Sequence, residues 1–119
     1  LLLFPSRVER AGSVFIHSLN ACSVSVLTLS PSLLISIDPI LVPSIRVIVS
    51  AGEPCPQVLA KKWLGHGRRF FNAYGPTETS ICATIYEFNT DNLPEASENE
   101  TVPIGTPIEH VKIRVVDSK

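Results

Sequence analysis

The stretch Asn-Ala-Tyr-Gly-Pro-Thr-Glu-Thr, residues 72–79, places an aromatic ring, a Gly-Pro turn, hydroxyl groups and a carboxylate next to one another. The run Arg-Phe-Phe precedes it at residues 69–71, and an apolar run follows at residues 81–85. Short apolar runs bounded by turn residues are typical of buried strands. We therefore expect a strand to end in this turn and to present its polar groups at a surface.

Four residues of the turn carry groups that a nucleotide can use. Tyr74 has a flat ring on which a base can stack, and Gly75 lets the backbone approach a ligand closely. Thr77 can donate its hydroxyl to a phosphate oxygen, and Glu78 can supply the oxygen ligand that Mg²⁺ prefers. The same residues are also typical of a plain tight turn, with Thr77 as a helix N-cap and Glu78 in the first helical turn. The chemistry of the turn leaves both interpretations open.

Residues 72–78 resemble the core motif of adenylate-forming enzymes, in the form typical of amino-acid adenylation domains of nonribosomal peptide synthetases. Two further stretches agree, in the same order along the chain. Residues 49–54 resemble the strand-to-loop segment that precedes this motif, and residues 102–108 resemble the family's Gly-x-Pro motif, which a strand follows at residues 111–117. Thr106 is a departure, because the family often has Arg or Lys there.

Helix and strand signals alternate along the chain. Residues 11–22 and 56–65 have helical patterns, and residues 24–29, 45–49 and 70–73 are compact apolar runs typical of strands. This alternation predicts an α/β fold with a mostly parallel sheet and covering helices. Ligands of such folds bind beyond the carboxyl ends of the strands. The resemblance implies the same class: a fragment of the N-terminal large subdomain of an adenylate-forming enzyme, with a more β-rich C-terminal part.

Each predicted helix has one apolar face. Phe15, Leu19 and Cys22 recur on one side of the first helix, and Leu59 and Trp63 share a side of the second. We expect these side chains to pack against the sheet.

Composition argues against several classes of partner. A formal net charge of −1 gives no electrostatic footprint for nucleic acid. The most apolar stretch, residues 24–37, is interrupted by serines and Pro31, and it is shorter than the roughly 18 residues that a membrane span needs. Cys22, Cys55 and Cys82 are irregularly spaced, which indicates neither a disulfide framework nor a zinc site. We therefore expect a cytoplasmic protein with no nucleic-acid or membrane partner.

The ends of the chain are unusual for a complete protein. It begins at Leu1, contains no methionine, and stops at Lys119 directly after a strand-like run. Together with the resemblance, these ends lead us to expect that residues 1–119 are a partial adenylation (AMP-binding) domain, truncated on both sides.

The resemblance also implies an activity. The parent enzyme would be an ATP-dependent ligase that joins the carboxylate of an amino acid to the α-phosphorus of ATP and releases pyrophosphate. The aminoacyl-AMP would then be loaded onto the phosphopantetheine arm of a carrier protein, with carrier and condensation domains in the same multidomain chain. ATP and Mg²⁺ are the implied cofactors. We expect the isolated chain to be inactive.

Roles for individual residues follow from the same resemblance. Thr77 and Glu78 would be catalytic, because Thr77 would contact the α-phosphate and Glu78 would hold Mg²⁺. Tyr74 would stack on adenine, and Asn72 would bind its exocyclic amine. The complete implied nucleotide-binding set is Gly52, Asn72, Ala73, Tyr74, Gly75 and Thr77.

The family's pocket for the amino-acid side chain maps onto six positions of this sequence. Ala51 and Ala73 are small, and none of the six carries a charge or an amide. Such a pocket is roomy and dry, and it resembles those that accept phenylalanine or a similar large aromatic side chain. The same positions are also typical of ordinary residues at strand ends. The six residues are Thr28, Val49, Ala51, Ala73, Ile81 and Cys82.

Two alternative functions stay open from the sequence. One is an acyl-CoA or aryl-acid ligase of the same superfamily, although the amino-acid sequence of residues 72–78 favours the peptide-synthetase branch. The other is a non-catalytic α/β binding module. The sequence that flanks this chain would distinguish them, since a module would have neither a phosphate loop nor a carrier domain beside it.

Overall fold

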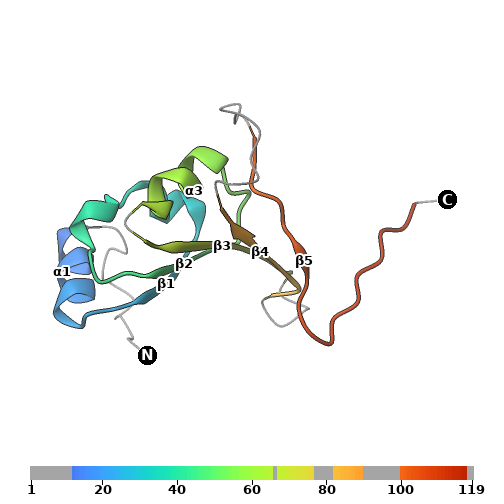
Figure 1. Ribbon diagram of the computed structural model, residues 1–119, viewed down its shortest axis with the longest axis horizontal. Helices are drawn as coiled ribbons and strands as arrows, with labels where there is room; N and C mark the ends of the chain where they lie inside the picture. The colour runs from blue at the N-terminus through green and yellow to red at the C-terminus, as the bar shows by residue number, and fades with distance from the viewer. Residues whose placement is uncertain (1–11, 66, 77–81, 90–99, 118–119) are drawn as a thin grey trace.

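One mixed sheet forms the centre of the molecule (Figure 1). The computed structural model describes residues 12–65, 67–76, 82–89 and 100–117. Within them the strand order is β1-β2-β3-β4-β5. Strands β1, β2 and β3 are parallel, whereas β4 and β5 run antiparallel to their neighbours. The strands are β1 (Val26–Leu29), β2 (Val47–Ala51), β3 (Arg69–Tyr74), β4 (Thr84–Phe88) and β5 (Thr106–Pro107).

The predicted α/β class is confirmed. The three apolar runs predicted as strands form β1, β2 and β3, and these strands pair in parallel. The antiparallel strands β4 and β5 make the C-terminal end of the sheet the more β-rich part, as the resemblance implied.

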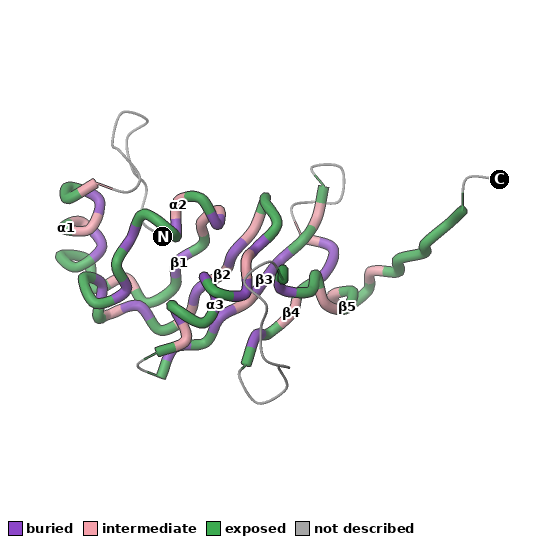
Figure 2. The backbone as a smooth tube through the Cα atoms, turned by 90° about the horizontal axis from the view of Figure 1, so that it is seen from above, coloured by how far each residue is buried: buried purple, intermediate pink, exposed green. Residues whose placement is uncertain are grey.

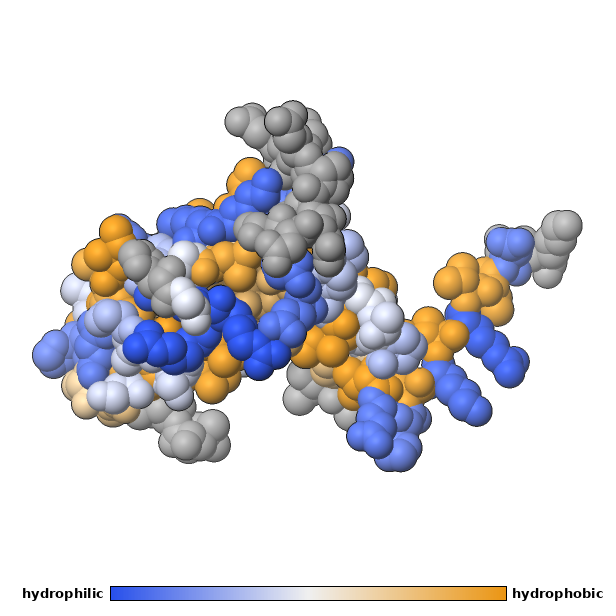
Figure 3. Space-filling view, viewed as in Figure 1, coloured by the Kyte–Doolittle hydropathy of each residue, from blue (hydrophilic) through white to orange (hydrophobic). Residues whose placement is uncertain are grey.

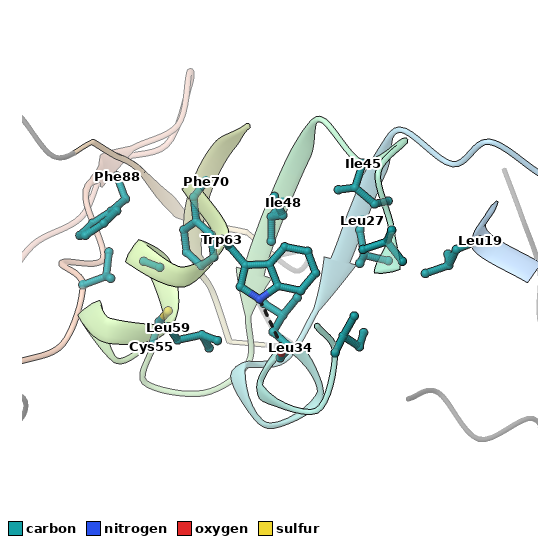
Figure 4. Close-up of a cluster of buried hydrophobic side chains, with 14 of the residues drawn as sticks. Leu19, Leu27, Leu34, Ile45, Ile48, Cys55, Leu59, Trp63, Phe70 and Phe88 are labelled. Carbon is teal, nitrogen blue, oxygen red and sulfur yellow. Dashed lines mark hydrogen bonds between the residues drawn. The ribbon is translucent and has the colours of Figure 1, made fainter. Parts of the chain in front are cut away.

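A row of apolar side chains crosses one face of the sheet. The register pairs Leu27 with Ile48, Ile48 with Phe70, and Phe70 with Phe88, so these side chains point to the same side. All four are buried. Trp63 packs over this row, and its indole nitrogen donates to the carbonyl oxygen of Leu34 at 3.3 Å (Figure 4). This face therefore holds the core.

Helices cover this face of the sheet. The helical segments are α1 (Ser13–Ala21), α2 (Pro31–Ile35), the 3₁₀ turn η1 (Pro39–Leu41) and α3 (Gln57–Leu64). Helix α3 lies over the middle of the sheet, and α1 lies beside β1 at the N-terminal side (Figure 1). Helix α2 and η1 were not predicted, because each is too short to show a helical period and begins with a proline.

The helix faces agree with the sequence at four of five positions. Phe15 and Leu19 on α1 are buried, as are Leu59 and Trp63 on α3. The prediction for Cys22 is wrong, because α1 ends one residue earlier and the cysteine occupies the exposed C-cap position.

The predicted strand at residues 111–117 is also wrong. The segment is extended but pairs with no strand among the described residues, and it runs away from the sheet after β5 (Figures 1 and 2). Val115 is 97% exposed and Val116 is 80% exposed. Hydrophobic and hydrophilic side chains alternate along this arm (Figure 3). The sequence thus has a strand pattern here, but a strand also requires a neighbour to hydrogen-bond.

Candidate functional site

A pocket of about 430 Å³ lies where β2 and β3 end. Three segments form its walls: the loop 52–54 after β2, the end of β3 with residues 75–76, and the stretch 101–104. Ligands of parallel α/β sheets bind in this position, beyond the carboxyl ends of the strands. The lining residues are Gly52, Glu53, Pro54, Asn72, Ala73, Tyr74, Gly75, Pro76, Thr101, Val102 and Ile104.

The pocket gathers every described residue of the predicted nucleotide-binding set. These residues are Gly52, Asn72, Ala73, Tyr74 and Gly75. Tyr74 ends β3 and is 49% exposed, so a planar ligand can reach its ring. Thr77 and Glu78, the two predicted catalytic residues, lie outside the described residues.

The loop after β2 is fixed by its backbone and by one carboxylate. Gly52 has a φ of +91°, a conformation that other residues rarely adopt. The backbone N–H of Ser32 donates to Oε2 of Glu53 at 3.1 Å, and the Ser32 hydroxyl donates to the same oxygen. These two hydrogen bonds, the hydroxyl first, lower the pKa of Glu53. The carboxylate thereby ties this wall of the pocket to the first turn of α2.

The stretch 101–104 is held against the start of α3. The Val102 N–H donates to the carbonyl oxygen of Cys55 at 2.8 Å, and the Gln57 N–H donates to that of Glu100 at 3.0 Å. Pro56 and Thr101 form an antiparallel bridge between these hydrogen bonds. This wall is therefore built from backbone contacts between segments that are far apart in the sequence.

Asn72 connects the same stretch to β3. Its side-chain nitrogen donates to the carbonyl oxygens of Val102 at 3.1 Å and Pro103 at 3.0 Å. The Asn72 side chain is almost fully buried, and the residue also lines the pocket. Two of the three walls thus meet at this amide.

The predicted amino-acid pocket occupies a different part of the sheet. The register pairs Thr28 with Val49 and Ala51 with Ala73, so these four residues lie on the face opposite the helices. Thr28 is exposed, Val49 and Ala51 are half-buried, and Ala73 is buried. Among the four, Ala73 also lines the pocket described above.

The remaining two residues of that predicted pocket are not both placed. Cys82 is half-buried and precedes β4, and its thiol donates to the carbonyl oxygen of Thr84 at 3.2 Å. Ile81 lies outside the described residues. The structure therefore brings four of the six predicted pocket residues onto one face.

Sequence reasoning missed six of the residues that line the pocket at the strand ends. Residues 53–54 and 102–104 belong to stretches that the resemblance already singled out, so the signal was present but not used for the site. Thr101 carried no signal of its own. These additional residues are Glu53, Pro54, Pro76, Thr101, Val102 and Ile104.

No group of three or more His, Cys, Asp or Glu side chains that could hold a metal ion occurs in the described ranges. No helix within the same ranges combines the length and apolar character needed to cross a bilayer.

The whole sequence, residues 1–119, matches the family model described as AMP-binding enzyme. The chain belongs to this family. Tyrocidine synthase 1 from Brevibacillus parabrevis is 39% identical over 105 residues, which are 88% of this chain and 9% of that protein. The probable non-canonical nonribosomal peptide synthetase CymA from Salinispora arenicola is 34% identical over 116 residues, 98% of this chain and 1% of that protein. The AMP-binding chain thus spans less than a tenth of either relative.

A solved structure has the same fold as this chain. The crystal structure of IdnL7 matches the AMP-binding chain with a TM-score of 0.65 and 25% sequence identity, over 77% of this chain and 20% of that one. The resemblance to adenylation domains of peptide synthetases, first seen in residues 72–78, is therefore confirmed for the family and for the fold.

Proposed function

We propose that these residues form part of an adenylating domain of a nonribosomal peptide synthetase, which converts an amino acid and ATP into aminoacyl-AMP. The observation that carries this proposal is the pocket at the ends of β2 and β3, which gathers all five described residues of the implied nucleotide set. Its position and its half-exposed aromatic ring suit a purine base.

The residues of the pocket fit the base of ATP in distinct ways. The Tyr74 ring would stack on adenine, and the Asn72 amide oxygen would accept a hydrogen bond from the exocyclic amine. Gly52 and Gly75 let the backbone approach the nucleotide without a side chain in the way. Beyond this pocket, by resemblance, Thr77 would contact the α-phosphate and Glu78 would hold Mg²⁺.

The implied cofactors address a problem of charge. ATP supplies the electrophilic phosphorus and the pyrophosphate leaving group, and Mg²⁺ neutralises negative charge on the phosphates. The amino-acid carboxylate and the phosphates are all anionic, so fixed donors around them lower the barrier to their approach. Within this chain, the Thr77 hydroxyl would be such a donor.

The amino-acid side chain would bind on the open face of the sheet, which is the face opposite the helices. Four candidate residues, Thr28, Val49, Ala51 and Ala73, are brought together there, and Ile81 and Cys82 would complete the set. Their small or apolar character favours phenylalanine or a similar aromatic amino acid.

The product would pass to the phosphopantetheine thiol of a carrier protein. Carrier and condensation domains would be partners within the same multidomain chain, in the cytoplasm, where Cys22, Cys55 and Cys82 remain free thiols. The large size of the synthetases related to this chain supports this arrangement. The isolated 119-residue chain would not adenylate an amino acid.

Exchange of labelled pyrophosphate into ATP tests the proposal in an adenylation domain that contains this chain. Exchange should depend on added amino acid and should be faster with phenylalanine or tyrosine than with leucine or aspartate. Tyr74→Ala should raise the KM for ATP about tenfold, because a base loses its stacking partner, whereas Tyr74→Phe should retain the wild-type KM. A KM unchanged in Tyr74→Ala would show that the base binds elsewhere, and a preference for aspartate would contradict the aromatic assignment.

A further inference from the structure

Gly105 lies where the stretch 101–104 leaves the pocket and the chain turns to pair with β4. Its φ is +83°, and β5 begins at the next residue. A Cβ atom at this position would overlap the carbonyl group of Ile85 and would lie 2.7 Å from the backbone nitrogen of Tyr86. These groups belong to the backbone of β4, which is paired with β3 on its other side, so they cannot move aside as a flexible side chain could. The chain at residue 105 therefore approaches β4 more closely than any residue with a side chain allows.

Backbone hydrogen bonds on both sides of Gly105 hold the chain in this position. On the N-terminal side, the Val102 N–H donates to the carbonyl oxygen of Cys55 at 2.8 Å, next to the start of α3. On the C-terminal side, the Ile108 N–H donates to the carbonyl oxygen of Ala83 at 3.0 Å, next to the start of β4. The stretch 101–104 is thus attached to α3 before Gly105 and to β4 after it, and the close contact at Gly105 lies between these attachments.

The residue before Gly105 connects this contact to the pocket. Ile104 lines the pocket and is 48% exposed, so a ligand can reach its side chain. Tyr74, at the end of β3, lines the same pocket. A side chain at residue 105 would force the chain away from β4 by on the order of 1 Å, since packed non-bonded atoms stay about 3.5 Å apart. Such a shift would move Ile104 relative to Tyr74 and change the shape of the space between them.

We propose that Gly105 is a positioning residue of the nucleotide pocket, because its lack of a side chain lets β4 hold the stretch 101–104 in place. The proposal rests on the proposed function, since it assumes that ATP occupies this pocket. Gly105 is not among the residues that line the pocket, so it acts on the nucleotide through Ile104. Its role is to fix the distance between one wall of the pocket and the sheet that carries the other.

Calorimetric titration with ATP tests this role in an adenylation domain that contains this chain. Gly105→Ala should raise the Kd for ATP at least about tenfold. Gly67→Ala is the matched control, because Gly67 also has a positive φ, +72°, but a Cβ atom there would meet nothing within 4 Å. The control should leave the Kd within about twofold of the wild-type value, although urea unfolding should show that both variants are destabilised.

The two outcomes that count against the proposal are distinct. An equal rise of the Kd in both variants, or no rise in Gly105→Ala, would overturn the positioning role, while ATP binding by the wild type would leave the proposed function intact. Absence of ATP binding by the wild type would overturn both.

A double-mutant cycle tests whether Gly105 acts through Ile104. Ile104→Ala removes a half-exposed side chain from the pocket and should itself raise the Kd for ATP. Adding Gly105→Ala to this variant should raise the Kd by less than about threefold more, because the side chain that it would displace is already gone. A further tenfold rise would show independent effects and would overturn the action through Ile104.

Hydrogen exchange in the wild type decides the case in which Gly105→Ala does not fold. The Val102 N–H is protected by its hydrogen bond to the carbonyl oxygen of Cys55 and belongs to the wall that Gly105 holds. Saturating ATP should slow its exchange at least about threefold, because a ligand that contacts this wall stabilises its closed state. An exchange rate unchanged by ATP would show that the position of this wall does not matter to the nucleotide, and the proposal would fail.

Discussion

The two faces of the sheet differ in what covers them, although the same strands supply both. On the helical side, Ile48 and Phe70 are completely buried. On the other side, Val26 is 56% exposed and Val49 is only half-buried. Because neighbouring residues of a strand point to opposite faces, a single step along β2 moves from the fully buried Ile48 to the half-buried Val49.

This difference separates the stabilising core from the predicted amino-acid pocket. The buried row under α3 holds the strands together, and a packed core tolerates little change of volume. The open face carries the four placed residues of the predicted amino-acid pocket, Thr28, Val49, Ala51 and Ala73. Substitutions on the open face should therefore cost less stability than substitutions on the covered face.

The largest expected effect comes from comparing adjacent residues of β2. Ile48→Ala should lower the free energy of unfolding by about 2–5 kcal/mol, because it removes buried methyl groups and leaves a cavity. Val49→Ala should lower it by less than about 1 kcal/mol, because that side chain is only partly buried. Equilibrium urea unfolding measures both values. Similar losses for the two variants would show that the open face is packed in the intact protein, and the comparison between faces would fail.

A second pair, of adjacent arginines, sharpens the comparison. Arg68 is 5% exposed, lies 5.8 Å from the Trp63 ring, and donates to three backbone carbonyl groups between residues 39 and 45. Arg69 points to the open side, where it forms an exposed ion pair with Glu87 at 2.6 Å.

Substitution by methionine keeps an unbranched side chain in each case and removes the donors. Arg68→Met should lower the free energy of unfolding by about 2 kcal/mol, because buried carbonyl groups lose their partners. Arg69→Met should lower it by less than about 1 kcal/mol, as expected for an exposed ion pair. Thermal or urea unfolding of the two variants under the same conditions gives the difference. An Arg69→Met loss equal to that of Arg68→Met would contradict the assignment of Arg69 to a solvated face.

The sequence predicts the parallel half of the fold well because its signals are local. The apolar runs around Val26, Val47 and Phe70 form strands. Leu59 and Trp63 on α3 face the hydrophobic core, as their spacing indicates. The position of the candidate site follows from the same information, because the end of a parallel strand is where ligands bind.

The walls of the pocket depend on contacts that no local pattern reveals. The hydrogen bond from Val102 to Cys55 and those from Asn72 to Val102 and Pro103 join segments separated by a long stretch of chain. The segment 111–117 shows the converse, since its alternating pattern is clear but no described strand lies beside it. Pattern predicts the tendency of a segment, whereas its neighbours decide the outcome.

The smallest expected effect concerns the carboxylate that links the helical layer to the pocket. Both hydrogen bonds from Ser32 favour the ionised form of Glu53, and they lower its pKa below the ordinary value of 4.5. A lowered pKa in the folded protein contributes stability above the ordinary pKa, and this contribution is lost as the pH falls through the folded pKa. Glu53→Gln should therefore lower the free energy of unfolding slightly at neutral pH, and the difference from wild type should shrink below about pH 4.5.

Urea unfolding of the wild type and of Glu53→Gln between about pH 3 and 7 measures this difference. Ser32→Ala is the matched control from the other partner, because it removes the hydroxyl donor and leaves the backbone N–H in place. It should reduce the same pH dependence without abolishing it. Parallel curves for the wild type and Glu53→Gln over the whole range would mean that the carboxylate is not held by α2. The loop 52–54 would then be held in place by its backbone alone, and α2 would not stabilise this wall of the pocket.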